Sequence, residues 1–122
     1  MQKTILIADD NKLLLATLRQ VLECQPGFVV CGEAVNGQDA IEKALRLKPD
    51  LIVLDISMPV MNGLDAAHTL RQMMPYVPIL LFTIHKTRLS AAEALASGAS
   101  GIAFKGDGIL GLVNQAKTLL HS

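Results

Sequence analysis

Five short apolar runs alternate along the chain with longer segments whose apolar residues recur at helical spacing. The runs, each ending near Gly, Pro, Asp or Asn, are Thr4–Ala8, Phe28–Glu33, Leu51–Leu54, Ile79–Phe82 and Gly101–Phe104. Most are apolar at successive positions, as strands must be when helices cover both faces of a parallel sheet. The alternation therefore predicts repeated strand–helix–strand units and a doubly wound α/β fold with a parallel sheet.

The five expected helices share apolar residues spaced three and four positions apart. These residues are Leu14, Leu18, Val21 and Leu22; Ile41, Ala44 and Leu45; Leu64, Ala67 and Leu70; Leu89, Ala92 and Ala96; and Ile109, Leu112, Val113, Ala116 and Leu120. Asn11 can cap the first helix, and Ser97-Gly98 can end the fourth. Right-handed crossovers in such a fold leave ligand sites beyond the carboxyl ends of the strands.

A chain of 122 residues has the size of one domain, so residues 1–122 are expected to form a single unit. Its formal net charge is +0 and its Lys and Arg residues are scattered, so we expect no direct nucleic acid binding by this domain. No export signal or membrane-spanning apolar stretch is found, which favours a cytoplasmic protein with no membrane association. Cys24 and Cys31 are therefore expected to be reduced core residues.

Polar residues stand at the ends of four expected strands. Asp9-Asp10 follows the first strand, Asp55 the third, Thr83 the fourth and Lys105 the fifth. Each alone has an ordinary explanation as a helix cap, a strand residue or a solvated charge. Together they place three carboxylates on one rim, where the charges repel one another unless a cation is present. A hard divalent cation is the simplest solution.

The same residues suit the chemistry of phosphoryl transfer. Mg²⁺ prefers oxygen ligands and keeps waters that a substrate phosphate can replace. Lys105 can pair with one phosphoryl oxygen and Thr83 can donate its hydroxyl to another, so that charge is neutralised while Asp55 attacks phosphorus. The pattern predicts Mg²⁺-dependent phosphorylation of Asp55, with Thr83 and Lys105 as the catalytic groups beside it.

Four motifs occur in order along the chain: Asp9-Asp10, the segment 54–59 with Gly63, Thr83, and the segment 98–101 that leads to Lys105. Together they resemble the receiver domains of two-component response regulators, over the whole chain. The resemblance implies a flavodoxin-like fold with a five-stranded sheet in the order 2-1-3-4-5. It also implies phosphorelay signal transduction, in which a histidine kinase, a phosphotransfer protein or a small phosphodonor phosphorylates Asp55.

The resemblance further implies a ligand set and an output. Asp10 and Asp55 would bind Mg²⁺ directly, Asp9 through water, and Ser57 through its main-chain carbonyl. Such a domain is a regulatory phosphoacceptor and not an enzyme, although it promotes its own phosphorylation from small donors and its own dephosphorylation. Phosphorylation would switch partner contacts or produce a homodimer. The segments 25–28 and 32–34 resemble those of receivers that precede a helix-turn-helix, DNA-binding output domain.

Two residues at the expected switch depart from the family pattern. Ile84 stands after Thr83 where a small residue is usual, and its stiff β-branched side chain is expected to narrow the route to Asp55. The alternative is that Ile84 packs inward as part of the core. Ile102 replaces the aromatic residue usually found three positions before Lys105, so a ring cannot rotate into the space that Thr83 leaves.

Three other functions compete with this interpretation. A flavin carrier needs small and hydroxyl residues after the first strand, whereas residues 9–13 are acidic and bulky. A phosphatase-type hydrolase needs a second aspartate where Ser57 stands. The strongest alternative is a receiver-like binding module that signals without phosphorylation. The presence of the three aspartates, Thr83 and Lys105 disfavours this alternative.

His85 is interpreted as a loop residue that modulates hydrolysis.

Overall fold

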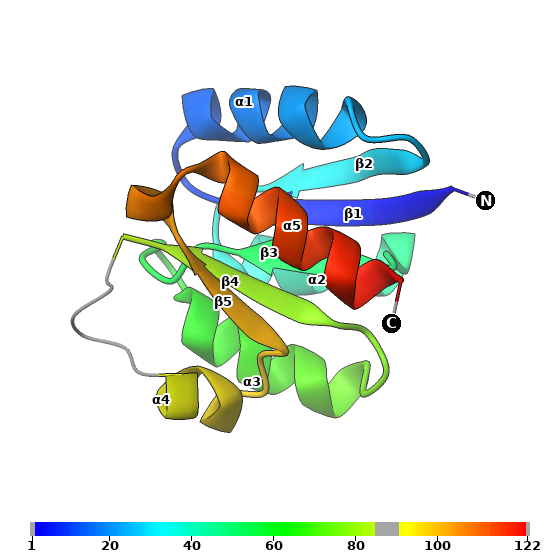
Figure 1. Ribbon diagram of the computed structural model, residues 1–122. Coiled ribbons are helices and arrows are strands. Elements are labelled where there is room, and N and C mark those ends of the chain that lie inside the picture. The colour runs from blue at the N-terminus through cyan, green and yellow to red at the C-terminus, as the bar shows by residue number, and fades with distance from the viewer. Residues whose placement is uncertain (1, 85–90, 122) are drawn as a thin grey trace.

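The five apolar runs form the five strands of one sheet, and the segments between them form helices (Figure 1). The computed structural model describes residues 2–84 and 91–121, so His85 and Leu89 lie outside the described residues. The elements in chain order are β1 Lys3–Ala8, α1 Lys12–Glu23, β2 Phe28–Ala34, α2 Gly37–Leu47, β3 Leu51–Leu54, α3 Gly63–Met73, β4 Ile79–Thr83, α4 Ala91–Ala96, β5 Gly101–Phe104, the 3₁₀ turn η1 Lys105–Asp107, and α5 Ile109–Leu120.

The sheet is parallel throughout, and its strand order β2-β1-β3-β4-β5 confirms the expected doubly wound topology. Three strands extend one residue beyond the predicted runs, to Lys3, Ala34 and Thr83. These residues are included because each has a partner in the ladder: Lys3 pairs with Phe28, Ala8 with Ala34, and Thr83 with Phe104. Main-chain pairing therefore sets the strand ends, whichever side chains stand there.

Alternate residues of each strand point to opposite faces of the sheet and build two hydrophobic clusters. In β1, Leu6 and Ala8 pack on the face covered by α2, α3 and α4, whereas Ile5 and Ile7 pack on the face covered by α1 and α5. Figure 1 shows this three-layer arrangement, with α1 and α5 on one side of the strands and α3 and α4 on the other. Burial on both faces leaves the carboxyl edge of the strands as the place for polar residues.

Asparagine caps fix the starts of three helices. Asn11, Asn36 and Asn62 each accept a hydrogen bond from a main-chain N–H three residues later, at 3.1, 2.7 and 2.9 Å. This confirms the cap predicted at Asn11. The expected apolar face of α2 was wrong at Leu45, which is exposed, because it follows buried Ala44 by one position and so turns about 100° away from the sheet.

The two cysteines lie in different environments. Cys31 is partly buried in β2, but Cys24 is exposed, so the expectation that both are core residues was wrong for Cys24. Since α1 ends at Glu23, Cys24 lies in the turn that leads to β2, outside the helix face that packs on the sheet. Both are free thiols. Within residues 2–84 and 91–121 no helix has the length and apolar character needed to cross a membrane.

Candidate functional site

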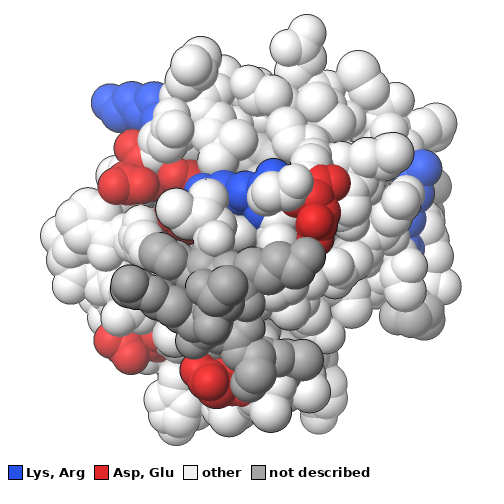
Figure 2. Space-filling model, turned by 60° about the vertical axis from the view of Figure 1, so that its left-hand side comes forward, with Lys and Arg blue, Asp and Glu red and all other residues white. Residues whose placement is uncertain are grey.

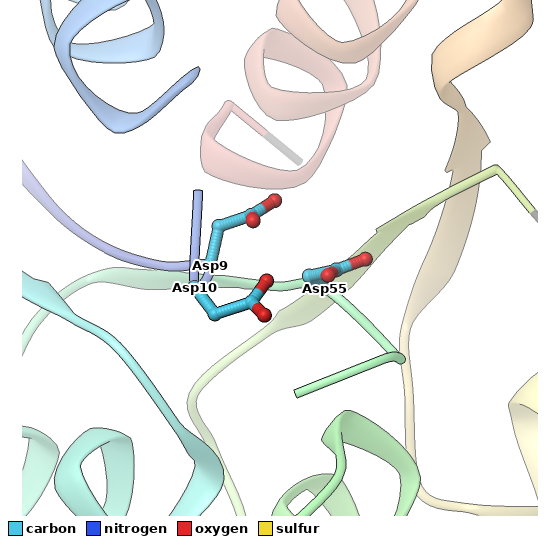
Figure 3. A group of neighbouring side chains, drawn as sticks. All are labelled: Asp9, Asp10 and Asp55. Carbon is cyan, nitrogen blue, oxygen red and sulfur yellow. The ribbon is translucent and has the colours of Figure 1, made fainter. Parts of the chain in front are cut away.

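The acidic residues stand at the carboxyl edge because main-chain hydrogen bonds continue just past two strands. The N–H of Asp9 donates to the Ala34 carbonyl at 3.0 Å, and the N–H of Asp55 donates to the Ala8 carbonyl at 2.9 Å. Each aspartate is therefore fixed in the first position after its strand. Figure 3 shows the carboxylates of Asp9, Asp10 and Asp55 extending beyond the strand ends to the same side.

Asp9, Asp10 and Asp55 form a compact acidic group. One carboxylate oxygen from each lies within 4.8 Å of the others. Asp9 and Asp55 are buried, with 2% and 6% of their surface exposed, whereas Asp10 is exposed. The structure thus brings together the three carboxylates that the sequence predicted to share one rim. The Asp10 carboxylate is open to solvent, and the other two are buried at the edge of the sheet.

Lys105 supplies a positive charge to this group. It follows β5, and its Nζ donates to Asp9 Oδ2 at 2.8 Å and lies 3.3 Å from Asp55 Oδ1. The ammonium also lies 5.8 Å from the centre of the Phe82 ring. Sequence reasoning missed this contact of Phe82, because an apolar residue inside a buried strand carries no signal that separates it from the rest of the core.

Thr83 and Ile84 take opposite orientations at the end of β4. Thr83 is fully buried and pairs in register with Phe104, the residue before Lys105, which places it at the same edge as the acidic group. Ile84 follows the last strand residue and is 68% exposed, so the alternative that it packs inward was wrong. Ile102 is partly buried against the face of the sheet covered by α2, α3 and α4.

Negative charge exceeds positive charge among the described residues that make up the site. Burial, and next the neighbouring charge of Asp9, raise the pKa of Asp55 above its usual range, and Lys105 only partly opposes this. Among the residues that the structure describes, the ammonium group of Lys105 pairs with Asp9 and Asp55, while Asp10 adds a third carboxylate to the group. A hard divalent ion with oxygen ligands fits this donor set, because carboxylate and carbonyl oxygens are what Mg²⁺ prefers. Ser57 is exposed and lies two residues after Asp55, and its main-chain carbonyl would be a further oxygen ligand for the ion.

Basic side chains do not form a continuous patch on the face shown in Figure 2, as far as the described residues go. Among the described residues visible in Figure 2, basic side chains are separated by acidic and uncharged ones. A nucleic-acid backbone is usually met by a basic stripe. This face offers none in the part of the chain that the structure describes.

Residues 5–114 match the family model described as the response regulator receiver domain, and the chain belongs to this family. It is 39% identical over 101 residues to the transcriptional regulatory protein LnrK of Bacillus subtilis (strain 168), an alignment that covers 83% of this chain and 46% of LnrK. It is 35% identical over 105 residues to the chemotaxis protein CheY of Thermotoga maritima, covering 86% of this chain and 87% of CheY. The chain thus spans about half the length of LnrK.

A crystal structure of a LuxR-family two-component response regulator from Aurantimonas sp. SI85-9A1 has a TM-score of 0.93 and 29% identity, covering 99% of this chain and 86% of that one. These similarities confirm the predicted receiver family, the flavodoxin-like fold and a role in phosphorelay signal transduction. They give no support to a receiver-like module that signals without phosphorylation. The chain comprises the receiver unit, whose role is regulatory.

Proposed function

We propose that Asp55 is the phosphoacceptor of this receiver and that Thr83 and Lys105 act on the same phosphoryl group. The observation that carries the proposal is the position of Lys105 Nζ, 3.3 Å from Asp55 Oδ1 and 2.8 Å from Asp9 Oδ2. An oxygen of Asp55 forms the new bond to phosphorus while the bond from phosphorus to the donor breaks. Lys105 then pairs with a phosphoryl oxygen, and the Thr83 hydroxyl donates to another.

Asp10, Asp55 and the Ser57 carbonyl would hold Mg²⁺, and Asp9 would bind it through water. When bound, the ion supplies positive charge that offsets the charge on the phosphoryl oxygens. The different environments of Asp9 and Asp10 support these roles, because Asp9 is buried and Asp10 is exposed. Both oxygens of Asp9 accept hydrogen bonds, Oδ1 from the Asn11 N–H at 2.9 Å and Oδ2 from Lys105. Asp10 is exposed and is better placed for direct ligation.

The donor would be a histidine kinase, a phosphotransfer protein or a small phosphodonor. Phosphorylation would alter the face formed by α4, β5 and α5, because Thr83 ends β4 and Lys105 follows β5. The alternative is that phosphorylation produces a homodimer through α1 and α5. The similarity to LnrK, a transcriptional regulatory protein of about twice this length, supports an output through a DNA-binding domain in the same protein. A cytoplasmic location stays a prediction.

Intact-mass measurement with acetyl phosphate and Mg²⁺ tests the phosphoacceptor. The wild-type chain should gain one phosphoryl group, and Asp55→Asn should gain none. Asp65→Asn is the matched control, because it removes an exposed carboxylate on α3 and should be labelled like the wild type. Labelling that persists in Asp55→Asn, or that moves to His85, would overturn the assignment.

Thermal unfolding tests the metal site separately. A ligand that binds only the native state at ten times its Kd stabilises it by about 1.4 kcal/mol, which raises Tm by a few degrees in a domain of this size. The wild-type Tm should rise in millimolar Mg²⁺, and the rise should shrink in Asp10→Ala. Glu42→Ala, which removes an exposed carboxylate from α2, should keep the full response. A wild-type Tm that is unchanged up to tens of millimolar Mg²⁺ would contradict the metal site.

A further inference from the structure

Gly37, the first residue of α2, touches the loop that leads from Asp55 to α3. Its N–H donates to the Met61 carbonyl at 2.8 Å. A Cβ placed on Gly37 would lie 2.5 Å from the Met61 carbonyl oxygen and 3.0 Å from that of Asn62. Both are backbone atoms that cannot swing aside as the end of a side chain can. The contact therefore requires glycine, or the loop must move.

Both sides of this contact are held in place. Asn36 caps α2 by accepting from the Asp39 N–H at 2.7 Å, which fixes Gly37. On the other side, the Met61 N–H donates to the Pro59 carbonyl at 2.7 Å across Val60, whose φ is 68°. This tight γ-turn puts a β-branched residue in the left-handed region, a strained conformation that persists only where surrounding contacts impose it.

The far end of the loop is anchored directly on the phosphoacceptor. The Gly63 N–H donates to the Ile56 carbonyl at 2.9 Å. A Cβ on Gly63 would lie 2.0 Å from the carbonyl oxygen of Asp55, so α3 begins in direct contact with the main chain of that residue. Residues 56–62 are therefore fixed at Asp55, at Gly63 and, across to α2, at Gly37. A displacement at Met61 has to be absorbed between these anchors, where Ser57 lies.

Helix energetics alone would favour a different residue at position 37. The φ of Gly37 is not in the left-handed region, so alanine could adopt its backbone conformation. Alanine is more favourable than glycine in the interior of a helix. What opposes alanine here is the approach of the loop.

We propose that Gly37 is a positioning residue for the phosphoacceptor site. By donating to Met61 and by having no side chain, it sets the path of residues 56–62 and so the place of the Ser57 carbonyl beside Asp55. This inference rests on the proposed function, because it assigns to Gly37 the support of a carbonyl that would bind Mg²⁺ next to the phosphoacceptor. Groups that orient metal ligands from outside typically affect metal affinity or activity 10–100-fold.

Gly37→Ala tests the proposal against two glycine controls. Gly111→Ala adds a methyl group to α5 where no atom lies within 4 Å, and Gly32→Ala in β2 meets the movable ends of Leu47 and Leu6 at 2.7 and 3.4 Å. Gly37→Ala should weaken Mg²⁺ affinity and slow acetyl-phosphate labelling about tenfold, while both controls keep wild-type values. The NMR amide signals of residues 56–63 should shift in Gly37→Ala and stay in place in the controls.

Unchanged Mg²⁺ affinity and unchanged amide signals in Gly37→Ala would overturn the proposal. An equal loss of Mg²⁺ affinity and labelling rate in Gly32→Ala would also overturn it, because that result would indicate destabilisation alone. If the wild-type chain neither binds Mg²⁺ nor accepts phosphate, the proposed function fails, and the amide signals still decide whether Gly37 sets the loop. If Gly37→Ala does not fold, Gly37→Ala/Met61→Gly removes the Met61 Cγ contact at 2.9 Å and keeps the carbonyl clash, so the same losses are expected.

Discussion

Lys105 and Asp9, which are 96 positions apart in the sequence, form a 2.8 Å ion pair at the carboxyl edge of the sheet. The side chain of Asp9 is 3% exposed and that of Lys105 is 19% exposed. A carboxylate this deeply buried needs a partner, because leaving an ion unpaired away from water is costly. The pair therefore ties the end of β5 to the end of β1 before any phosphate is present.

Replacing Lys105 with Met should destabilise the metal-free domain by about 3 kcal/mol, because it leaves the Asp9 charge buried without its cation. Urea unfolding in a chelator measures the change. The double variant Asp9→Asn/Lys105→Met should recover most of the loss, since the buried charge goes with its partner. Lys117→Met, which changes an exposed lysine on α5, is the control and should have little effect. Equal destabilisation in the single and double variants would contradict the pairing.

Asp55→Asn should stabilise the metal-free domain at neutral pH. Burial and the Asp9 charge raise the folded-state pKa of Asp55, so the folded protein holds this proton more tightly than the unfolded chain does. Stability consequently falls as pH rises from the unfolded value of about 3.9 through the raised folded value. The advantage of Asp55→Asn should therefore be full above that pH and disappear below about pH 4. Denaturant midpoints at several pH values, in a chelator, measure it, and an advantage that grew toward acid pH would refute the electrostatic explanation.

Ile84→Ala should change phosphorylation kinetics with little effect on stability. Ile84 is 68% exposed next to Thr83, so the truncation should cost no more than about 0.5 kcal/mol. Removing a stiff side chain from the approach to Asp55 should speed labelling by acetyl phosphate and shorten the lifetime of the acyl phosphate, by roughly tenfold or more. Leu110→Ala, at a residue 71% exposed on α5, is the control. Wild-type rates in Ile84→Ala would show that this residue does not gate the site.

Cys24 should react with iodoacetamide before Cys31. Cys24 is exposed, whereas burial raises the pKa of the Cys31 thiol and so reduces the reactive thiolate at any given pH. The alkylation rate of Cys31 should keep increasing at pH values above the usual thiol range. Peptide mass mapping of the wild-type chain, with Cys24→Ser and Cys31→Ser as controls, measures both rates. Equal rates at pH 8 would contradict the difference in environment.

Local pattern was sufficient for the elements, because strands buried on both faces must be apolar at successive positions and helices must repeat every three or four residues. The five runs and their spacing predicted the parallel sheet, and the strand ends predicted where Asp9, Asp55 and Lys105 would meet. Errors arose where a side chain's direction depends on the last turn of an element. Leu45 and Cys24 are exposed because each lies just outside the face or segment that packs. In α4 the expected face was wrong at Ala92 and Ala96, which are exposed, whereas Ala94 is buried against the sheet.

The sequence by itself determined which chemical groups reach the carboxyl edge, since the parallel direction of the strands follows from the pattern of elements and the strand order is implied by the resemblance to receiver domains. Only the tertiary structure decided how these groups share charge, with Lys105 bonded to Asp9 and close to Asp55, and which carboxylate stays open to solvent. It alone also placed Gly37 against Met61, 24 positions later in the chain. The physical reason is that such contacts join segments that are distant in sequence, and their distances are set by the packing of helices on the sheet, which no local pattern encodes.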